Sequence, residues 1–107
     1  MAYSEKLAAR VRRTLSGRSD VEEKKMFGGL AFMVAGNMCC GIMKEDLVLR
    51  LGPERGAKAL EKPHTRPFDF TGKPMRGMVA AEGIKSAGAL RRWLGRAVDF
   101  AGSLPPK

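Results

Sequence analysis

The sequence predicts a two-layer α+β domain in which helices flank an antiparallel sheet, in the order α-β-β-β-α-β-β-α. Apolar residues recur at helical spacing near both ends of the chain. Between these ends, short apolar segments alternate with turn-forming residues, which is typical of strands joined by hairpins. The 107 residues contain no internal repeat and no linker, so we expect a single domain over residues 1–107.

The first helix is predicted over residues 4–16, with Ser4 as its N-cap. Four apolar residues share one face of this helix at helical spacing. They are Leu7, Ala8, Val11 and Leu15. Residues 18–25, "RSDVEEKK", are mostly charged, and we interpret them as a connector rather than as a strand.

Three strands are then predicted from apolar runs that tight turns separate. The first run covers residues 26–35 and the second covers residues 38–43, with the turn signal "AGN" between them. In the third run, residues 47–51, three leucines alternate with residues of the other face, as in a half-buried strand. These runs predict an antiparallel meander.

The second half of the chain begins with a short helix that follows Gly52, has Pro53 in its first turn and ends at Pro63. Turn chemistry dominates residues 64–77, with a short strand around residues 68–70, and residues 77–84 form a further strand. The last helix follows Ser86 as its N-cap and has one continuous apolar stripe. This stripe consists of Leu90, Trp93, Leu94, Ala97, Val98 and Ala101.

Composition and charge indicate which kinds of partner and which cellular location to expect. The net charge is +9, which favours nucleic acid or another polyanion as a partner, although the charge is spread along the chain. No apolar run reaches the ~20 residues of a membrane span, and the first residues lack a signal-peptide pattern. We therefore expect a cytoplasmic protein without membrane contact, in which both cysteines are reduced thiols.

The segment "KKMFGGLAFMVAGNMCCGIM", residues 24–43, invites three chemical interpretations, and all three are weak. The paired glycines lack the spacing and the following helix of a phosphate loop, and permit a bulge or close packing instead. Cys39 and Cys40 are adjacent, so we expect their side chains on opposite faces of a strand, where they cannot chelate one ion. A cysteine nucleophile paired with His64 is the third, but thiols in an apolar strand are more often core residues. We expect no metal, no cofactor and no catalytic residue.

The same hairpin is apolar at both odd and even positions. In a two-layer domain one sheet face normally meets water and carries polar residues. Either helices cover both faces, or the second face contacts a partner. We favour a partner protein, with self-association to a dimer as the commonest form of such contacts.

Four segments together resemble the TfoX/Sxy family, specifically its N-terminal domain as a short stand-alone protein. They are "MFGGLAFMVAGNMCCGI", "DLVLRLGPE", "PFDFTGKPMRGMV" and "LRRWLGRAVDFAGSLPPK". The resemblance implies a secretion-chaperone-like α+β fold and a non-enzymatic role without cofactor. Named members regulate bacterial natural competence, acting in transcription with a cyclic-AMP-receptor-type activator. The full-length regulators have a second, helical domain, whereas this sequence ends at Lys107.

Two hypotheses from different classes follow. The first is a regulatory or adaptor domain that contacts protein through the apolar sheet face and DNA through basic residues of both terminal helices. The candidate DNA contacts are Arg10, Arg12, Arg13, Arg92 and Arg96. The second hypothesis is a small-molecule- or anion-binding module, or a minor enzyme, that uses the 64–77 loop. Its candidate residues are Arg50, His64, Asp69, Lys73 and Arg76, and an alternative role for Asp69 and Arg76 is to pair and hold the loop.

Overall fold

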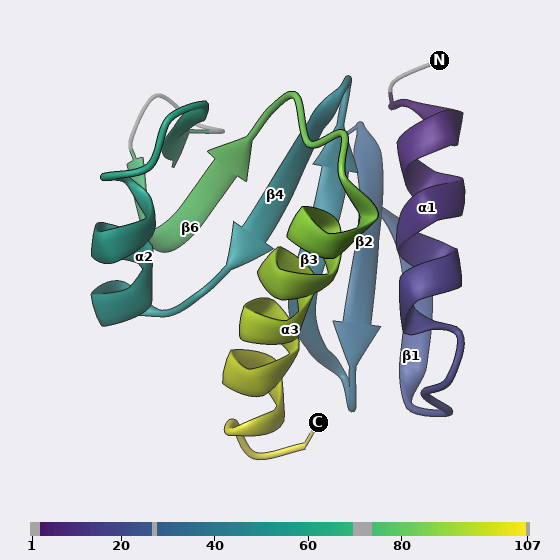
Figure 1. Ribbon diagram of the computed structural model, residues 1–107. Helices are drawn as coiled ribbons and strands as arrows, with labels where there is room; N and C mark the ends of the chain where they lie inside the picture. The colour runs from purple at the N-terminus through teal and green to yellow at the C-terminus, as the bar shows by residue number, and fades with distance from the viewer. Residues whose placement is uncertain (1–2, 27, 70–73, 107) are drawn as a thin grey trace.

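The computed structural model describes residues 3–26, 28–69 and 74–106. These ranges contain three helices and one sheet of six strands. Figure 1 shows how the helices lie against the sheet. The elements are α1 (Glu5–Leu15), β1 (Val21–Met26), β2 (Gly29–Val34), β3 (Asn37–Met43), β4 (Asp46–Arg50), α2 (Pro53–Ala59), β5 (Thr65–Asp69), β6 (Pro74–Ala81) and α3 (Ala87–Gly102). The predicted α+β class, with helices against an antiparallel sheet, is confirmed. The order has one strand more than predicted, at β1.

The strands are arranged in the order β1-β2-β3-β4-β6-β5, and each neighbouring pair is antiparallel. The turn between β2 and β3 has positive φ at both central residues, 51° at Ala35 and 84° at Gly36. Such backbone angles define the primed two-residue turns that match the twist of a hairpin. The turn predicted from "AGN" is therefore confirmed.

Strand β1 corrects the interpretation of residues 18–25 as a connector. It pairs with β2 along its full length, from Val21 opposite Val34 to Met26 opposite Gly29. Its charges are compatible with a strand because β1 lies at the sheet edge, where only one side is paired. Charged side chains on an edge strand oppose pairing with another chain. The connector was predicted because residues 18–25 have few apolar side chains. An edge strand can form with few apolar side chains, so this prediction was wrong.

All three helices contribute to one core on one face of the sheet. Figure 1 shows α1 and α3 side by side on this face, and the core includes Ala59 of α2. Both predicted N-caps are confirmed: the Ser4 hydroxyl accepts from the Leu7 N–H at 3.1 Å, and the Ser86 hydroxyl accepts from the Ala89 N–H at 3.2 Å. The predicted apolar stripes of α1 and α3 face this core, with Trp93 and Val98 half-buried at its border.

The two cysteines do not point to opposite faces, which corrects that prediction. The register between β2 and β3 shifts, so that Phe32 lies opposite Cys40 while Met33 lies opposite Met38. Cys39 is therefore the extra residue of a β-bulge, which breaks the alternation of side chains. Both thiols enter the core under the helices, and each side chain is 0% exposed.

The second face of the sheet carries its own small apolar cluster. Val48, Phe68 and Met78 are buried there, with Met38 and Met43 packed against them. Every described core residue of the helices belongs to the other cluster, so the helices cover one face only. The sequence left two alternatives for the hairpin that is apolar on both faces: helices on both faces, or a partner on the second face. The described residues exclude the first alternative.

The region after α2 contains more strand than its turn-forming residues predict. Residues 65–69 form β5, which pairs with β6. Pro67 is compatible with a strand here because β5 is the other edge of the sheet. The predicted strand over residues 77–84 corresponds to β6, Pro74–Ala81, while residues 70–73 lie outside the described part of the chain.

Candidate functional site

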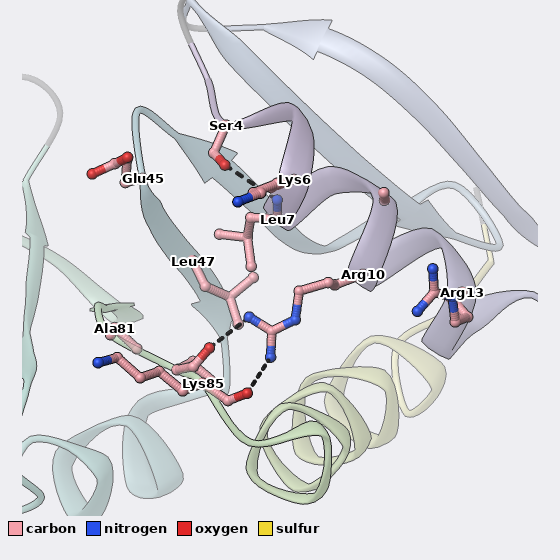
Figure 2. A pocket seen from close by; sticks show the side chains of 12 residues that line it. Ser4, Lys6, Leu7, Arg10, Arg13, Glu45, Leu47, Ala81 and Lys85 are labelled. Atoms are coloured by element: carbon pink, nitrogen blue, oxygen red, sulfur yellow. Dashed lines mark hydrogen bonds between the residues drawn. The ribbon is translucent and has the colours of Figure 1, made fainter.

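A basic groove of about 520 Å³ lies between α1 and the connector that joins β6 to α3 (Figure 2). Its floor is apolar and is formed by Leu7, Leu47, Ala81 and Ile84. The cationic lining residues are Lys6, Arg10, Arg13 and Lys85, and Glu45 is the carboxylate among the lining residues. The groove is thus an apolar channel in a strongly positive local field.

Arg10 connects the two walls of this groove. Figure 2 shows its guanidinium reaching from α1 to the connector, where Nη1 donates to the Ile84 carbonyl at 2.6 Å and Nη2 to the Lys85 carbonyl at 3.1 Å. Among the described residues, no carboxylate lies within 4.0 Å of this half-buried guanidinium. Its hydrogen bonds go to neutral groups, so its positive charge has no counter-ion among the residues that the structure describes.

Arg12 makes a contact within the fold. Its guanidinium donates two hydrogen bonds of 2.8 Å to the carboxylate of Glu23 on β1. This bidentate pair holds the pKa of the Glu23 carboxyl below its ordinary value, and raises the pKa of Arg12. Arg13, one residue further on, is exposed and lines the basic groove.

The candidate arginines of α3 lie on its exposed side. Arg92 is exposed, and Arg96 lies over the Trp93 ring at 5.3 Å from its centroid. Arg96 also lines a groove of about 740 Å³ between α2 and α3, together with Lys58 and Lys62. The two terminal helices do lie on the same face of the sheet, but Arg10 and Arg12 already serve contacts within the fold.

The candidate residues of the 64–77 loop are only partly within the described structure. Lys73 and the side chain of Arg76 lie outside it, so the predicted Asp69–Arg76 pair also does. Asp69 lines a surface pocket of about 500 Å³ with Arg66, while neither Arg50 nor His64 lines that pocket. Arg50 instead lies 5.5 Å from the ring centroid of Phe100 on α3. The anion site at this loop remains a prediction.

Catalytic and metal chemistry has little support among the described residues. Cys39 and Cys40 are completely buried, whereas His64 is exposed in the turn before β5. The hydrogen bond between the thiols and their burial hold the pKa of Cys40 well above its ordinary value, which suppresses the nucleophilic thiolate. In the ranges that the structure covers, no three His, Cys, Asp or Glu side chains are grouped to hold a metal ion. No helix in that part of the chain combines the length and the apolar composition of a transmembrane span.

The second sheet face is bordered by charges of both signs. On β1, Glu22 lies opposite Met33 and Lys24 lies opposite Ala31, which places their side chains on this face. At the other border, Arg66 of β5 forms an ion pair with Asp46 of β4. The apolar cluster thus has a mixed polar rim, which is the common anatomy of a protein contact surface.

Sequence reasoning missed Lys6 and Lys85, which the fold brings to one groove from positions far apart in the chain. Each is an isolated lysine in the sequence, and charge alone does not distinguish it from the other cations. Arg10 was predicted as a DNA contact, and its contact within the fold was not predicted. The signal for that contact is its position on α1 beside the buried face, since a long cationic side chain there reaches a neighbouring element.

Comparison with protein families matches residues 13–101 to the TfoX N-terminal domain. A search of curated proteins found no match, and a search of solved structures found none. The match covers most of the chain and includes β1 to β6 and nearly all of α3. The chain therefore belongs to the TfoX N-terminal domain family and is a competence-regulator-like domain.

Proposed function

We propose that this protein is a non-enzymatic regulatory adaptor domain that acts in transcription regulation by contacting protein. Membership of the TfoX family supports a regulatory role. The observation that carries the protein contact is the placement of the helices: their described core residues all belong to one sheet face. The other face keeps an apolar centre that is rich in methionine, a residue that adapts to varied contact surfaces.

The occupant that we propose for this second face is a second copy of the chain. A two-fold dimer needs a surface that is complementary to itself. The second face has an apolar centre at Met38 and Met43, and its rim carries both acidic and basic groups. In a two-fold contact, Glu22 of one copy can therefore meet Lys24 of the other, while Arg66 and Asp46 of each copy remain paired with each other. A partner of one charge would instead favour a rim of the opposite charge.

Sedimentation equilibrium of the wild-type protein and of Met43→Glu tests this proposal. We expect a dimer for the wild type and a monomer for the variant, because an unpaired carboxylate is costly to bury in an interface. Met43 is only half-buried, so the variant should stay folded, which its circular dichroism checks. Glu45→Gln, which changes an exposed residue beside β4, is the matched control and should remain dimeric. A monomeric wild-type protein would contradict the proposed dimer. Affinity capture with Met43→Glu and Glu45→Gln then tests whether another protein binds the second face.

We also propose DNA contact through α3 rather than through α1. Arg92 and Arg96 are exposed on this helix, and Lys58 and Lys62 lie near Arg96 across the groove beside α2. Trp93 in the same groove offers a partly exposed aromatic ring next to these cations. Arg12 is neutralised by Glu23 and is a weaker candidate for phosphate. Positive charge in this arrangement favours phosphate backbones without specifying a sequence.

A further inference from the structure

We propose that the basic groove between α1 and the β6–α3 connector binds an acidic peptide segment of a partner protein, with an aliphatic side chain on the groove floor. This site lies on the helix side of the sheet and is separate from the second face discussed above. The inference therefore goes beyond the proposed dimer and can succeed or fail independently of it.

Charge complementarity is the first argument. Among the described residues, three lysine or arginine side chains and the Arg10 guanidinium line the groove, against one carboxylate, Glu45. Figure 2 shows Lys6 and Arg13 on either side of Arg10 along α1, with Lys85 on the connector. Within the described residues, Lys6, Arg13 and Lys85 have no ion-pair partner within 4.0 Å. Mutual repulsion of these cations is relieved when an anion enters.

Preorganisation is the second argument. The Arg10 guanidinium is fixed by two carbonyls of the connector, so binding loses little side-chain entropy at this position. A guanidinium has five N–H donors, and two hydrogen bonds leave others for a carboxylate. Because the same bonds hold the connector against α1, both walls of the groove keep their spacing before any ligand arrives.

The apolar floor selects a peptide over a nucleic acid. Leu7, Leu47 and Ala81 belong to the helix-side core, and Ile84 packs half-buried against it. A leucine or isoleucine side chain entering the groove would extend this core and exclude water from the charge pairs above it. Duplex DNA presents phosphates along a broad convex backbone and offers no aliphatic group for this floor. An acidic segment with an aliphatic anchor satisfies both parts of the groove.

The probe is a fluorescent peptide with one leucine flanked on both sides by glutamates, capped at both ends. We expect saturable binding by fluorescence anisotropy, and amide shifts in the ¹⁵N NMR spectrum confined to α1, residues 45–47 and residues 81–86. A peptide with glutamines in place of the glutamates should bind at least about tenfold more weakly, because the charge-assisted hydrogen bonds are lost. Replacing the leucine by serine should also weaken binding, since the floor then loses its occupant.

Matched charge reversals locate the site. The double variant Lys6→Glu and Lys85→Glu should bind the acidic probe at least about tenfold more weakly. Lys25→Glu with Arg91→Glu changes the net charge by the same amount, on β1 and α3, and should bind the probe nearly as well as the wild type. Both pairs are exposed, so each variant should keep its fold. Arg10 is left intact because its loss would free the connector.

Three outcomes would overturn the proposal. Equal weakening by both double variants would mean that the probe binds net charge rather than the groove. Amide shifts outside the groove would place the peptide elsewhere. The third outcome is that the acidic probe does not bind, whereas duplex DNA binds and loses affinity in the Lys6→Glu and Lys85→Glu double variant. This result would assign the groove to nucleic acid. Met43→Glu should bind the probe like the wild type, which separates this site from the dimer.

Discussion

At the scale of single residues, Cys39 and Cys40 show how one inserted residue changes the chemistry of a strand. Strict alternation would put one thiol on each face, but the bulge at Cys39 places both under the helices. The two thiols then interact, and the Cys40 pKa rises because of the hydrogen bond with Cys39 and because of burial. Nothing in the residue types themselves predicts the bulge, which depends on how β2 and β3 pair.

The raised Cys40 pKa predicts a loss of stability in alkali. Below pH ~9 the thiol is protonated in both states; above it the unfolded chain releases the proton and the folded chain keeps it. The free energy of unfolding should therefore fall as pH rises, by up to about 1.4 kcal/mol per pH unit from this group. Urea unfolding from about pH 7.5 to about pH 10.5 measures this slope, and Cys40→Ala should flatten it.

Ile42→Val is the control for this measurement, because it removes a buried methyl group from the same strand and keeps both thiols. It should lower the free energy of unfolding by about 0.5–1.5 kcal/mol at all pH values without changing the alkaline slope. If Cys40→Ala retained the wild-type slope after this comparison, the alkaline loss of stability would not come from the Cys40 thiol.

At the scale of elements, β1 and α1 depend on each other. Glu23 on the helix-side surface of β1 accepts both hydrogen bonds from Arg12, so a charged edge strand is attached to the helix that precedes it. The N-terminal side of α1 is held as well, since the Ser4 N–H donates to the Lys44 carbonyl at 2.6 Å. Helix α1 is therefore joined to the sheet at both ends, and this places the α1 wall of the basic groove.

A double-mutant cycle on Arg12→Ala and Glu23→Ala should give a coupling free energy of about 0.2–1 kcal/mol, the range for a well-formed surface pair. The lowered Glu23 pKa means that this coupling is fully present above pH ~4.5 and is lost as pH falls through that lowered value. The measurement is urea unfolding at neutral and acidic pH. Arg13→Ala with Glu23→Ala is the matched cycle, and a similar coupling there would mean a general charge effect.

At the scale of the whole molecule, the net charge of +9 is divided among surfaces with different environments. Cations of α1 gather over an apolar floor, whereas those of α3 and α2 border a groove with a tryptophan. The second sheet face has charges of both signs around an apolar centre. The three surfaces therefore carry different proposals: an acidic peptide at the basic groove, nucleic acid at α3, and a second copy of the chain at the second sheet face.

For the nucleic-acid surface, Arg92→Ala with Arg96→Ala should weaken duplex DNA binding and lower the slope of log affinity against log salt by about 2. Each lost phosphate contact releases about one counterion fewer. The measurement is a salt series of anisotropy titrations. Lys24→Ala with Lys25→Ala removes the same charge from β1 and should leave that slope nearly unchanged; an unchanged slope in the α3 variant would exclude this helix as the DNA contact.

The sequence alone determined the features that arise within a few residues. Apolar spacing located α1 and α3, serine hydroxyls located their first turns, and Ala35 with Gly36 located the hairpin, because each depends on neighbours along the chain. The sequence also indicated the family, since each of the motifs that carry the resemblance is a continuous segment of the chain. The tertiary structure alone decided that a charged segment is an edge strand, that two adjacent thiols share a face, and that Lys6, Arg10 and Lys85 share one groove. These outcomes depend on pairing register and on helix placement, which are set by contacts between residues far apart in the chain.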